Sequence, residues 1–218
     1  MILALALHAC VACAVDVTVM VHDGAGAPLS DAIVALYPHT GVVSAAIAST
    51  ERKMDQVDKQ FLPRVLAIHV GDTVIFPNSD NIRHHVYSFS PARTFQLPLY
   101  RGIPSEPVRF DTAGKVVLGC NIHDRMSAHI YVLDAPLFAM TEAGRHTFSG
   151  VAPGDYEVAV FHPRQSEQTD GARRALHVAP QATQSVELAV EVQDAVAPDN
   201  TARSPLELKF QALRRGAH

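Results

Sequence analysis

Four side chains whose types suit a metal ion lie in two places near the middle of the chain. Cys120, His123 and Met126 form a C-x-x-H-x-x-M run, and His84 lies upstream of it. One thiolate, two imidazoles and a weak axial thioether are a donor set that holds copper in both of its oxidation states. Because these donors fill every position around the ion, the set favours electron transfer over substrate binding or hydrolysis.

The cysteine count agrees with this interpretation. Of three cysteines, Cys10 and Cys13 lie in an apolar, uncharged opening, residues 1–14, whose small-x-small ending is typical of a signal-peptide cleavage site. Cleavage leaves Cys120 alone in an oxidising compartment without a disulfide partner, and metal ligation explains its neighbours. The opening therefore predicts export to the periplasm. A lipoprotein acylated at Cys10 is a weaker alternative, since the hydrophobic stretch before that residue is brief.

Composition narrows the classes of partner. Lysine and arginine number 18 against 22 aspartates and glutamates, the formal net charge is −4, and the basic residues are scattered. A nucleic-acid-binding surface is therefore not expected. Beyond the opening, no apolar stretch is long enough to span a bilayer, so no membrane span is expected in the mature chain.

The hydrophobic pattern predicts an all-β protein. Apolar and polar residues alternate with period two, as at Val15, Val17, Val19 and Val21, and glycine or proline interrupts the runs. No stretch has convincing helical periodicity. The further predicted strands cover 32–37, 65–70, 73–76, 84–90, 115–120, 128–133, 156–161, 174–178 and 185–192.

The predicted strands place the four donors at one end of a sandwich. Val116, Leu118 and Cys120 share a strand face, which directs the sulfur toward the core. Residues 120–126 are expected to form a seven-residue loop that brings cysteine, histidine and methionine around one point. His84 begins a strand after the turn-rich residues 77–81, which brings it to the same end.

Residues 52–134 resemble the cupredoxins. The resemblance rests on Gly71-Asp72-Thr73-Val74-Ile75-Phe76, Asn78, His84-His85-Val86 and the Cys120 run, whose short spacing is most similar to that of amicyanin. It implies a Greek-key β-sandwich in which His84, Cys120, His123 and Met126 bind one type 1 (blue) copper ion. It also implies single-electron transfer between periplasmic redox proteins, such as a cytochrome or a dehydrogenase. The chain also resembles exported plastocyanin-like proteins that are described as methylamine utilisation proteins.

Two features of the sequence depart from the cupredoxin pattern. His85 stands where the family commonly has an asparagine that ties the two ligand segments together, so either His84 or His85 is a possible first ligand. We favour His84, which occupies the family's ligand position, while strand alternation sends its neighbour to the opposite face. The charged pair Asp124-Arg125 replaces residues that are often apolar or proline, which suggests a partner chosen partly by charge.

The flanking segments resemble a different sandwich. Val19-Met20-Val21-His22-Asp23 and the turn Pro153-Gly154-Asp155-Tyr156 are similar to the two halves of a carboxypeptidase-regulatory-like, transthyretin-like β-sandwich, into which the cupredoxin would be inserted. Two modules in series are the alternative. No catalytic residue comes with this resemblance, which favours a structural or docking role. The predicted organisation is a signal peptide at 1–14, flanking strands at 15–50, a cupredoxin domain at 51–134, the rest of the flanking sandwich at 135–194 and a C-terminal tail at 195–218.

The expected function is that of an electron carrier and not of an enzyme. An enzyme needs an open metal position, and the remaining histidines in or beside strands, His69, His129, His146 and His162, show no ligand-like spacing. A copper storage or delivery protein is the first alternative, and a non-redox binding module with the same fold is the second.

Overall fold

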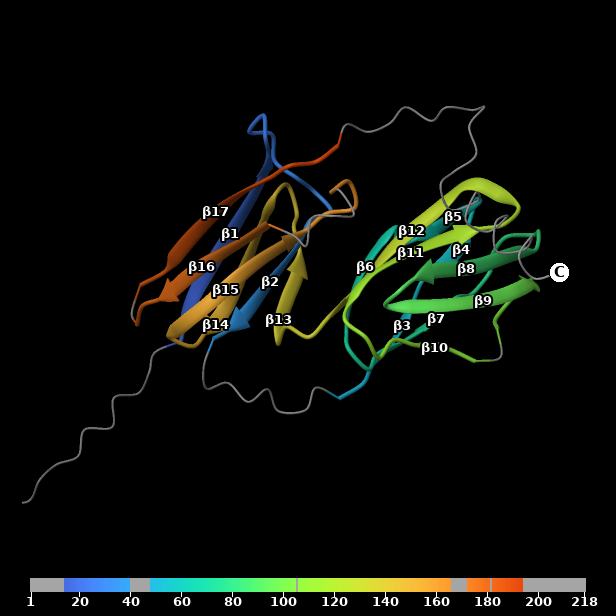
Figure 1. The fold of residues 1–218 in the computed structure, drawn as a ribbon, viewed down its shortest axis with the longest axis horizontal. Coiled ribbons are helices and arrows are strands. Elements are labelled where there is room, and N and C mark those ends of the chain that lie inside the picture. Colours follow the sequence, from blue (N-terminus) through green and yellow to red (C-terminus); the bar gives the residue numbers. More distant parts are fainter. Residues whose placement is uncertain (1–13, 40–47, 105, 166–171, 181, 194–218) are drawn as a thin grey trace, which may run out of the picture. The chain divides into compact units, whose positions relative to one another are not determined.

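The computed structural model describes residues 14–39, 48–104, 106–165, 172–180 and 182–193 (Figure 1). Within these ranges every regular element is a β-strand, which confirms the all-β prediction. Within them, no helix is long and apolar enough to cross a membrane. The predicted signal peptide, apart from its last residue, and the predicted tail at 195–218 lie outside the described residues.

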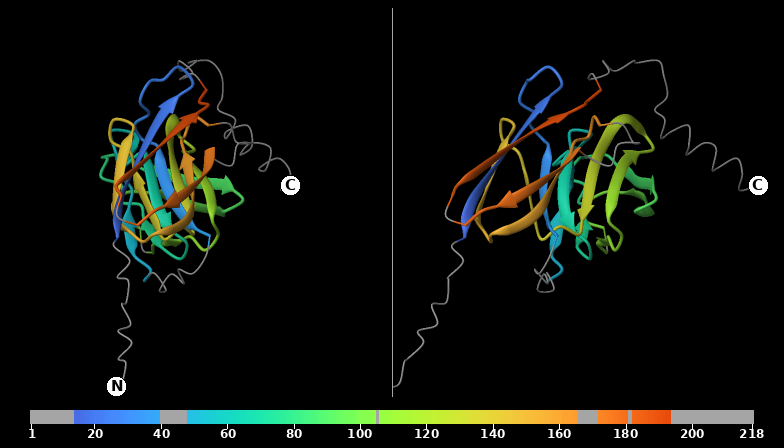
Figure 2. Two further views of the ribbon diagram at one scale, coloured as in Figure 1. Left: turned by 90° about the vertical axis from the view of Figure 1, so that its left-hand side faces the viewer. Right: turned by 60° about the vertical axis from the view of Figure 1, so that its left-hand side comes forward.

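The chain divides into two compact units. The first combines residues 1–43 with 139–192, and the second combines 44–138 with 193–218. Figure 2 shows their strands from two further directions.

The first unit contains two sheets, with strand orders β14-β1-β17 and β13-β2-β15-β16. Val17, Val19 and Val21 on β1 are at most 1 % exposed and pack in one core with residues of the other sheet, such as Val34 and Val158. The alternation read from the sequence therefore marks a buried face. The likeness of this unit to a transthyretin-like sandwich stays a prediction. Its strands are β1 Val15–Asp23, β2 Ile33–Pro38, β14 Arg145–Val151, β15 Gly154–Phe161, β16 Ala172–Val178 and β17 Gln184–Val190, together with β13 Leu137–Met140, which begins two residues before the unit boundary.

The second unit holds the predicted metal ligands. Its largest sheet has the order β6-β12-β11-β8-β9, a smaller one has the order β10-β7-β3, and β4 and β5 form a hairpin. Phe61, Phe76 and Phe110 are fully buried in its core. The strands are β3 Glu51–Lys53, β4 Asp55–Val57, β5 Gln60–Leu62, β6 Val65–His69, β7 Thr73–Ile75, β8 His84–Ser90, β9 Arg93–Tyr100, β10 Val108–Arg109, β11 Gly114–Cys120 and β12 His123–Leu133.

β9 is a strand that the sequence pattern missed. Phe95 and Leu97 alternate with exposed residues, but Pro98 interrupts the run. Proline lacks the N–H that a central strand must donate, and it is tolerated at a sheet edge. β9 is the edge strand of its sheet, which explains why the run is still a strand.

The segment after Cys120 differs from the expected seven-residue loop. Cys120 pairs with His123 across β11 and β12, so only Asn121 and Ile122 lie between the strands. His123 and Met126 therefore belong to β12. The pairing is irregular here, because Gly119 pairs with Ser127 while Cys120 pairs with His123, which leaves residues 124–126 without partners on β11. Met126 is nevertheless buried, at the start of an inward-facing series that continues through Ala128, Ile130 and Val132.

Candidate metal centre

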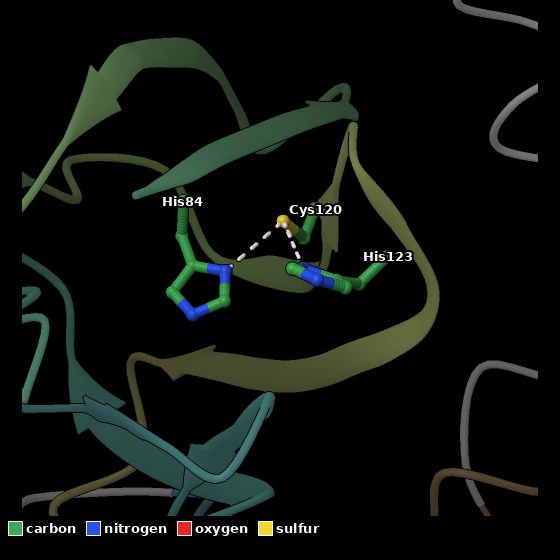
Figure 3. A group of neighbouring side chains, drawn as sticks. All are labelled: His84, Cys120 and His123. Atoms are coloured by element: carbon green, nitrogen blue, oxygen red, sulfur yellow. Dashed lines mark hydrogen bonds between the residues drawn. The ribbon is translucent and has the colours of Figure 1, made fainter. Parts of the chain in front are cut away.

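The side chains of His84, Cys120 and His123 converge on one point (Figure 3). The Cys120 sulfur lies 3.6 Å from Nδ1 of His84 and 3.7 Å from Nδ1 of His123. Nitrogen and sulfur atoms of the three side chains lie within 4.8 Å of one another. The two imidazole rings stand 4.9 Å apart between centroids and are inclined by 61°.

These separations fit a shared metal ion. A metal–sulfur bond of about 2.3 Å and a metal–nitrogen bond of about 2.0 Å, at an angle of about 110–120°, place sulfur and nitrogen about 3.5–3.7 Å apart. Both sulfur–nitrogen distances, 3.6 and 3.7 Å, lie in that range. A thiolate with two imidazoles suits copper or zinc, and a nearby thioether favours copper.

Adjacent strands bring the three donors together. Cys120 ends β11, His84 begins β8 and His123 begins β12, and β11 lies between the other two strands in the sheet. Cys120 is buried, with Val116 and Leu118 on the same buried face, as the alternation predicted. His84 is also fully buried, whereas His123 is half-buried. The His123 ring is therefore the part of the cluster that lies nearest to the surface.

Met126 and His85 have different places. Met126 is buried in the same core as Cys120 and lines a cavity together with His123, while its role as the axial ligand stays a prediction. His85 is half-buried beside Tyr87, with ring centroids 5.9 Å apart, and His84 is the one that joins the cluster. A backbone hydrogen bond from Asn121 N–H to the His85 carbonyl, at 3.3 Å, connects the Cys120 hairpin to the start of β8.

Asp80 binds the far side of the His84 ring. Because an ionised carboxylate only accepts hydrogen bonds, the Nε2–H of His84 donates to the Asp80 carboxylate at 2.6 Å, while Nδ1 faces the sulfur. The backbone N–H groups of Asp58 and Lys59 donate to the same carboxylate, at 2.6 and 2.9 Å. Burial raises the pKa of Asp80, but the hydrogen bonds from Lys59, His84 and Asp58 outweigh it, and the pKa is lowered. The carboxylate is therefore ionised at neutral pH.

Asn78 shapes the loop that carries Asp80. Its buried amide donates to the carbonyls of Ile82 and Tyr100, at 2.9 and 2.8 Å, and its side-chain oxygen accepts the Asp80 N–H at 3.1 Å. Asn78 thus holds the turn that the sequence predicted over 77–81. Asp80 is a residue of the site that the sequence patterns did not predict. The signal that would have marked it is a carboxylate two residues after this asparagine and four before His84.

A cavity of about 620 Å³ lies beside His123. Its charged walls include three exposed cations, Lys59, Arg64 and Arg125, and two carboxylates, Asp58 and Asp124. The pKa of His123 is lowered, first by burial and then by the charges of His84 and Lys59, against the opposing effect of Asp80 and Asp124. A neutral imidazole, the form that binds a metal, is therefore favoured at neutral pH.

Comparison with known proteins gives structural neighbours only. No family model matches the chain, and no curated protein matches its sequence. The structural neighbours are cupredoxins and cupredoxin-containing proteins. A copper-containing nitrite reductase from Thermus scotoductus SA-01 is 27 % identical over 44 % of this chain, with a TM-score of 0.37. This chain spans about a quarter of that protein, since the match covers 25 % of it.

Two smaller proteins match over nearly their whole length. A purple cupredoxin from Nitrosopumilus maritimus is 19 % identical, with a TM-score of 0.34, and the match covers 39 % of this chain and 100 % of that one. A reduced mutant form of amicyanin is also 19 % identical, with a TM-score of 0.35, over 46 % of this chain and 98 % of that one. The neighbours belong to the family that the sequence of residues 52–134 resembles. The chemistry of the site is inferred from its own side chains.

Proposed function

We propose that this protein is an exported type 1 copper protein that carries single electrons between redox partners in the periplasm. The observation that carries the proposal is the buried Cys120 sulfur, held 3.6 and 3.7 Å from two imidazole nitrogens. Copper supplies a one-electron couple when it is bound to such a donor set. The fold supplies the rigid frame, because the three donors sit on hydrogen-bonded neighbouring strands of one sheet.

The frame keeps the donor atoms in place during electron transfer. Cys120 and His84 are buried, and their strands pair directly, with Cys120 opposite Val86. Little movement is available to either side chain in a close-packed core. A small change of geometry between oxidation states favours fast transfer, and Met126 is the proposed axial donor that tunes the potential.

His123 is the proposed exit for the electron. It is the half-buried member of the cluster, and its neighbour Ile122 is 47 % exposed. The cavity beside it carries three cations and two carboxylates, so a partner such as a cytochrome or a dehydrogenase would be selected partly by charge. An electron carrier needs no open position on its metal, so no catalytic step is part of the proposed function.

Copper delivery is the second candidate function. The cavity favours it, because His123, one of the proposed copper ligands, lines that cavity. A carrier retains its ion through repeated oxidation and reduction, whereas a delivery protein releases the ion to a chelator of moderate affinity. Copper retention after redox cycling separates the two functions.

The first experiment is to add Cu(II) to the purified protein and record its visible absorption and electron paramagnetic resonance. We expect an intense thiolate-to-copper band with narrow hyperfine splitting, and we expect Cys120→Ser to lack both. Copper bound with the same spectrum by the serine variant would refute the proposed centre.

A further inference from the structure

The Asp80 carboxylate joins two parts of the second unit that are distant in sequence. One oxygen, Oδ2, accepts the His84 Nε2 proton at 2.6 Å and the Lys59 N–H at 2.9 Å. The other, Oδ1, accepts the Asp58 N–H at 2.6 Å. The His84 side chain is fully buried and that of Asp80 is 11 % exposed, so the bond between these two side chains is largely shielded from water. The two bonds from the turn join Asp80 to exposed residues.

The bond to His84 fixes which nitrogen faces the metal position. A neutral imidazole carries one proton, and a carboxylate at Nε2 holds it there, which leaves Nδ1 free to donate its lone pair. In the structure Nδ1 is the nitrogen that faces the Cys120 sulfur. The ring is therefore oriented for ligation by a contact on its far side.

The bonds to Asp58 and Lys59 hold a tight turn. These two residues connect β4 to β5, with Val57 paired to Gln60, and both have positive φ, 51° and 59°. Such two-residue hairpin turns have φ above zero at both central positions. Successive N–H groups in turns of this kind form a concave site for an anion, and the Asp80 carboxylate is the anion here.

That turn is also a wall of the cavity beside His123. Asp58 and Lys59 line it from the β4–β5 side, and Asp124 and Arg125 line it from the β12 side. A single carboxylate thus fastens the cavity wall to the buried ligand His84.

We propose that Asp80 is a positioning residue that lowers the reduction potential of the metal centre and fixes the Asp58–Lys59 turn beside the electron exit. The inference rests on the proposed copper function for its effect on the potential. A negative charge of low exposure that is hydrogen-bonded to a ligand stabilises the more highly charged oxidised ion. It also raises the basicity of the imidazole that binds the ion.

The test compares Asp80→Asn with Asp55→Asn. Asp55 is a control of similar exposure, because its side chain is 14 % exposed and, among the described residues, no hydrogen bond joins it to the three donors of the metal cluster. It accepts a Ser79 hydroxyl, a backbone N–H and the Lys53 ammonium at 3.2 Å, so it differs from Asp80 in having a charged partner. Both variants remove one negative charge. We expect the reduction potential of the copper-loaded protein to rise in Asp80→Asn and to move much less in Asp55→Asn. Equal shifts would overturn the effect on the potential.

The metal-free protein gives readouts that do not depend on copper. Nitrogen-detected NMR should find His84 protonated at Nε2 in the original protein and in Asp55→Asn, and a mixture of tautomers in Asp80→Ala. The Asp58 and Lys59 amides should be protected from hydrogen exchange and should lose that protection in Asp80→Ala. An unchanged tautomer and unchanged protection would overturn the positioning role.

The outcomes separate this inference from the proposed function. If no blue-copper spectrum forms, the proposed function fails, while the NMR and exchange results still decide whether Asp80 positions His84 and the turn. If the spectrum forms but the two asparagine variants agree in potential, the function stands and Asp80 does not set the potential. If Asp80→Ala does not fold, Asp80→Leu provides the same NMR comparison, because leucine is closer to aspartate in size and also cannot accept a hydrogen bond.

Discussion

Gly119 lies where a single added carbon should disturb the site. A Cβ placed on Gly119 would be 2.8 Å from both Cζ and Oη of Tyr87 and 3.3 Å from its Cε1. Comfortable carbon contacts are about 3.5–4.0 Å, so the ring would have to retreat by about 0.7–1.2 Å. Tyr87 is only 2 % exposed, so the ring has little space into which to move.

We expect Gly119→Ala to lower the free energy of unfolding of the second unit by about 1–2 kcal/mol. Overpacking of a closed core costs about 1–3 kcal/mol, and alanine recovers about 0.5–1 kcal/mol because it is less flexible than glycine in a strand. Native-state hydrogen exchange of the β11 and β12 amides measures the loss in the unit concerned. A second expected effect is a change in the thiolate-to-copper band, because Gly119 directly precedes Cys120.

Two controls test the steric reasoning. In Gly24→Ala the new Cβ would lie 3.1 Å from the carboxylate of Glu191, whose exposed side chain can move, so the loss of stability should be smaller. Tyr87→Leu removes the ring, so adding Gly119→Ala in that background should cost less than in the original protein. If Gly119→Ala costs nothing, or costs the same beside leucine, the clash with Tyr87 is not the cause.

Three further changes test other parts of the structure. Met126→Leu should retain copper but raise its reduction potential, because the axial thioether is lost; an unchanged potential in voltammetry would argue against axial ligation. Asn78→Ala should reduce stability by about 1–3 kcal/mol, since the carbonyls of Ile82 and Tyr100 lose buried donors; denaturant unfolding measures it, and no loss would show that other donors replace the amide. Burial lowers the pKa of His146 more than the Glu142 charge raises it, so the unfolded chain binds its proton first as the pH falls. The first unit should therefore lose stability as the pH falls from neutral through about 6.5, and His146→Gln should weaken this dependence in thermal unfolding measured across pH.

Short-range patterns in the sequence predicted most of the strands and the buried faces of β1 and β11. The alternation at Val116, Leu118 and Cys120 predicted a buried sulfur, and the structure confirms it. It succeeds because the direction of a side chain in a strand depends only on its position along the backbone. The same rule separated His84 from His85. It failed where the local signal is weak, as at β3, whose three residues Glu51–Lys53 are all exposed.

The length of the Cys120 turn was predicted wrongly for a related reason. A C-x-x-H-x-x-M run states which donors are near in sequence but not where strand pairing resumes. Pairing is decided by the partner strand and by the core that receives Met126, Ala128 and Ile130. Those contacts lie outside the motif, so the short hairpin was visible only in the folded chain.

The sequence by itself determined the all-β class and the burial of Cys120, and it predicted the four donors, because residue type and strand alternation are local properties. The tertiary structure decided that His84, Cys120 and His123 meet within 4.8 Å. It also decided that the Asp80 carboxylate accepts hydrogen bonds from the β4–β5 turn, which lies more than twenty residues away in sequence. Hydrogen bonds between distant segments form only when the whole unit packs, and packing places residues by shape and burial, which no short run of sequence encodes.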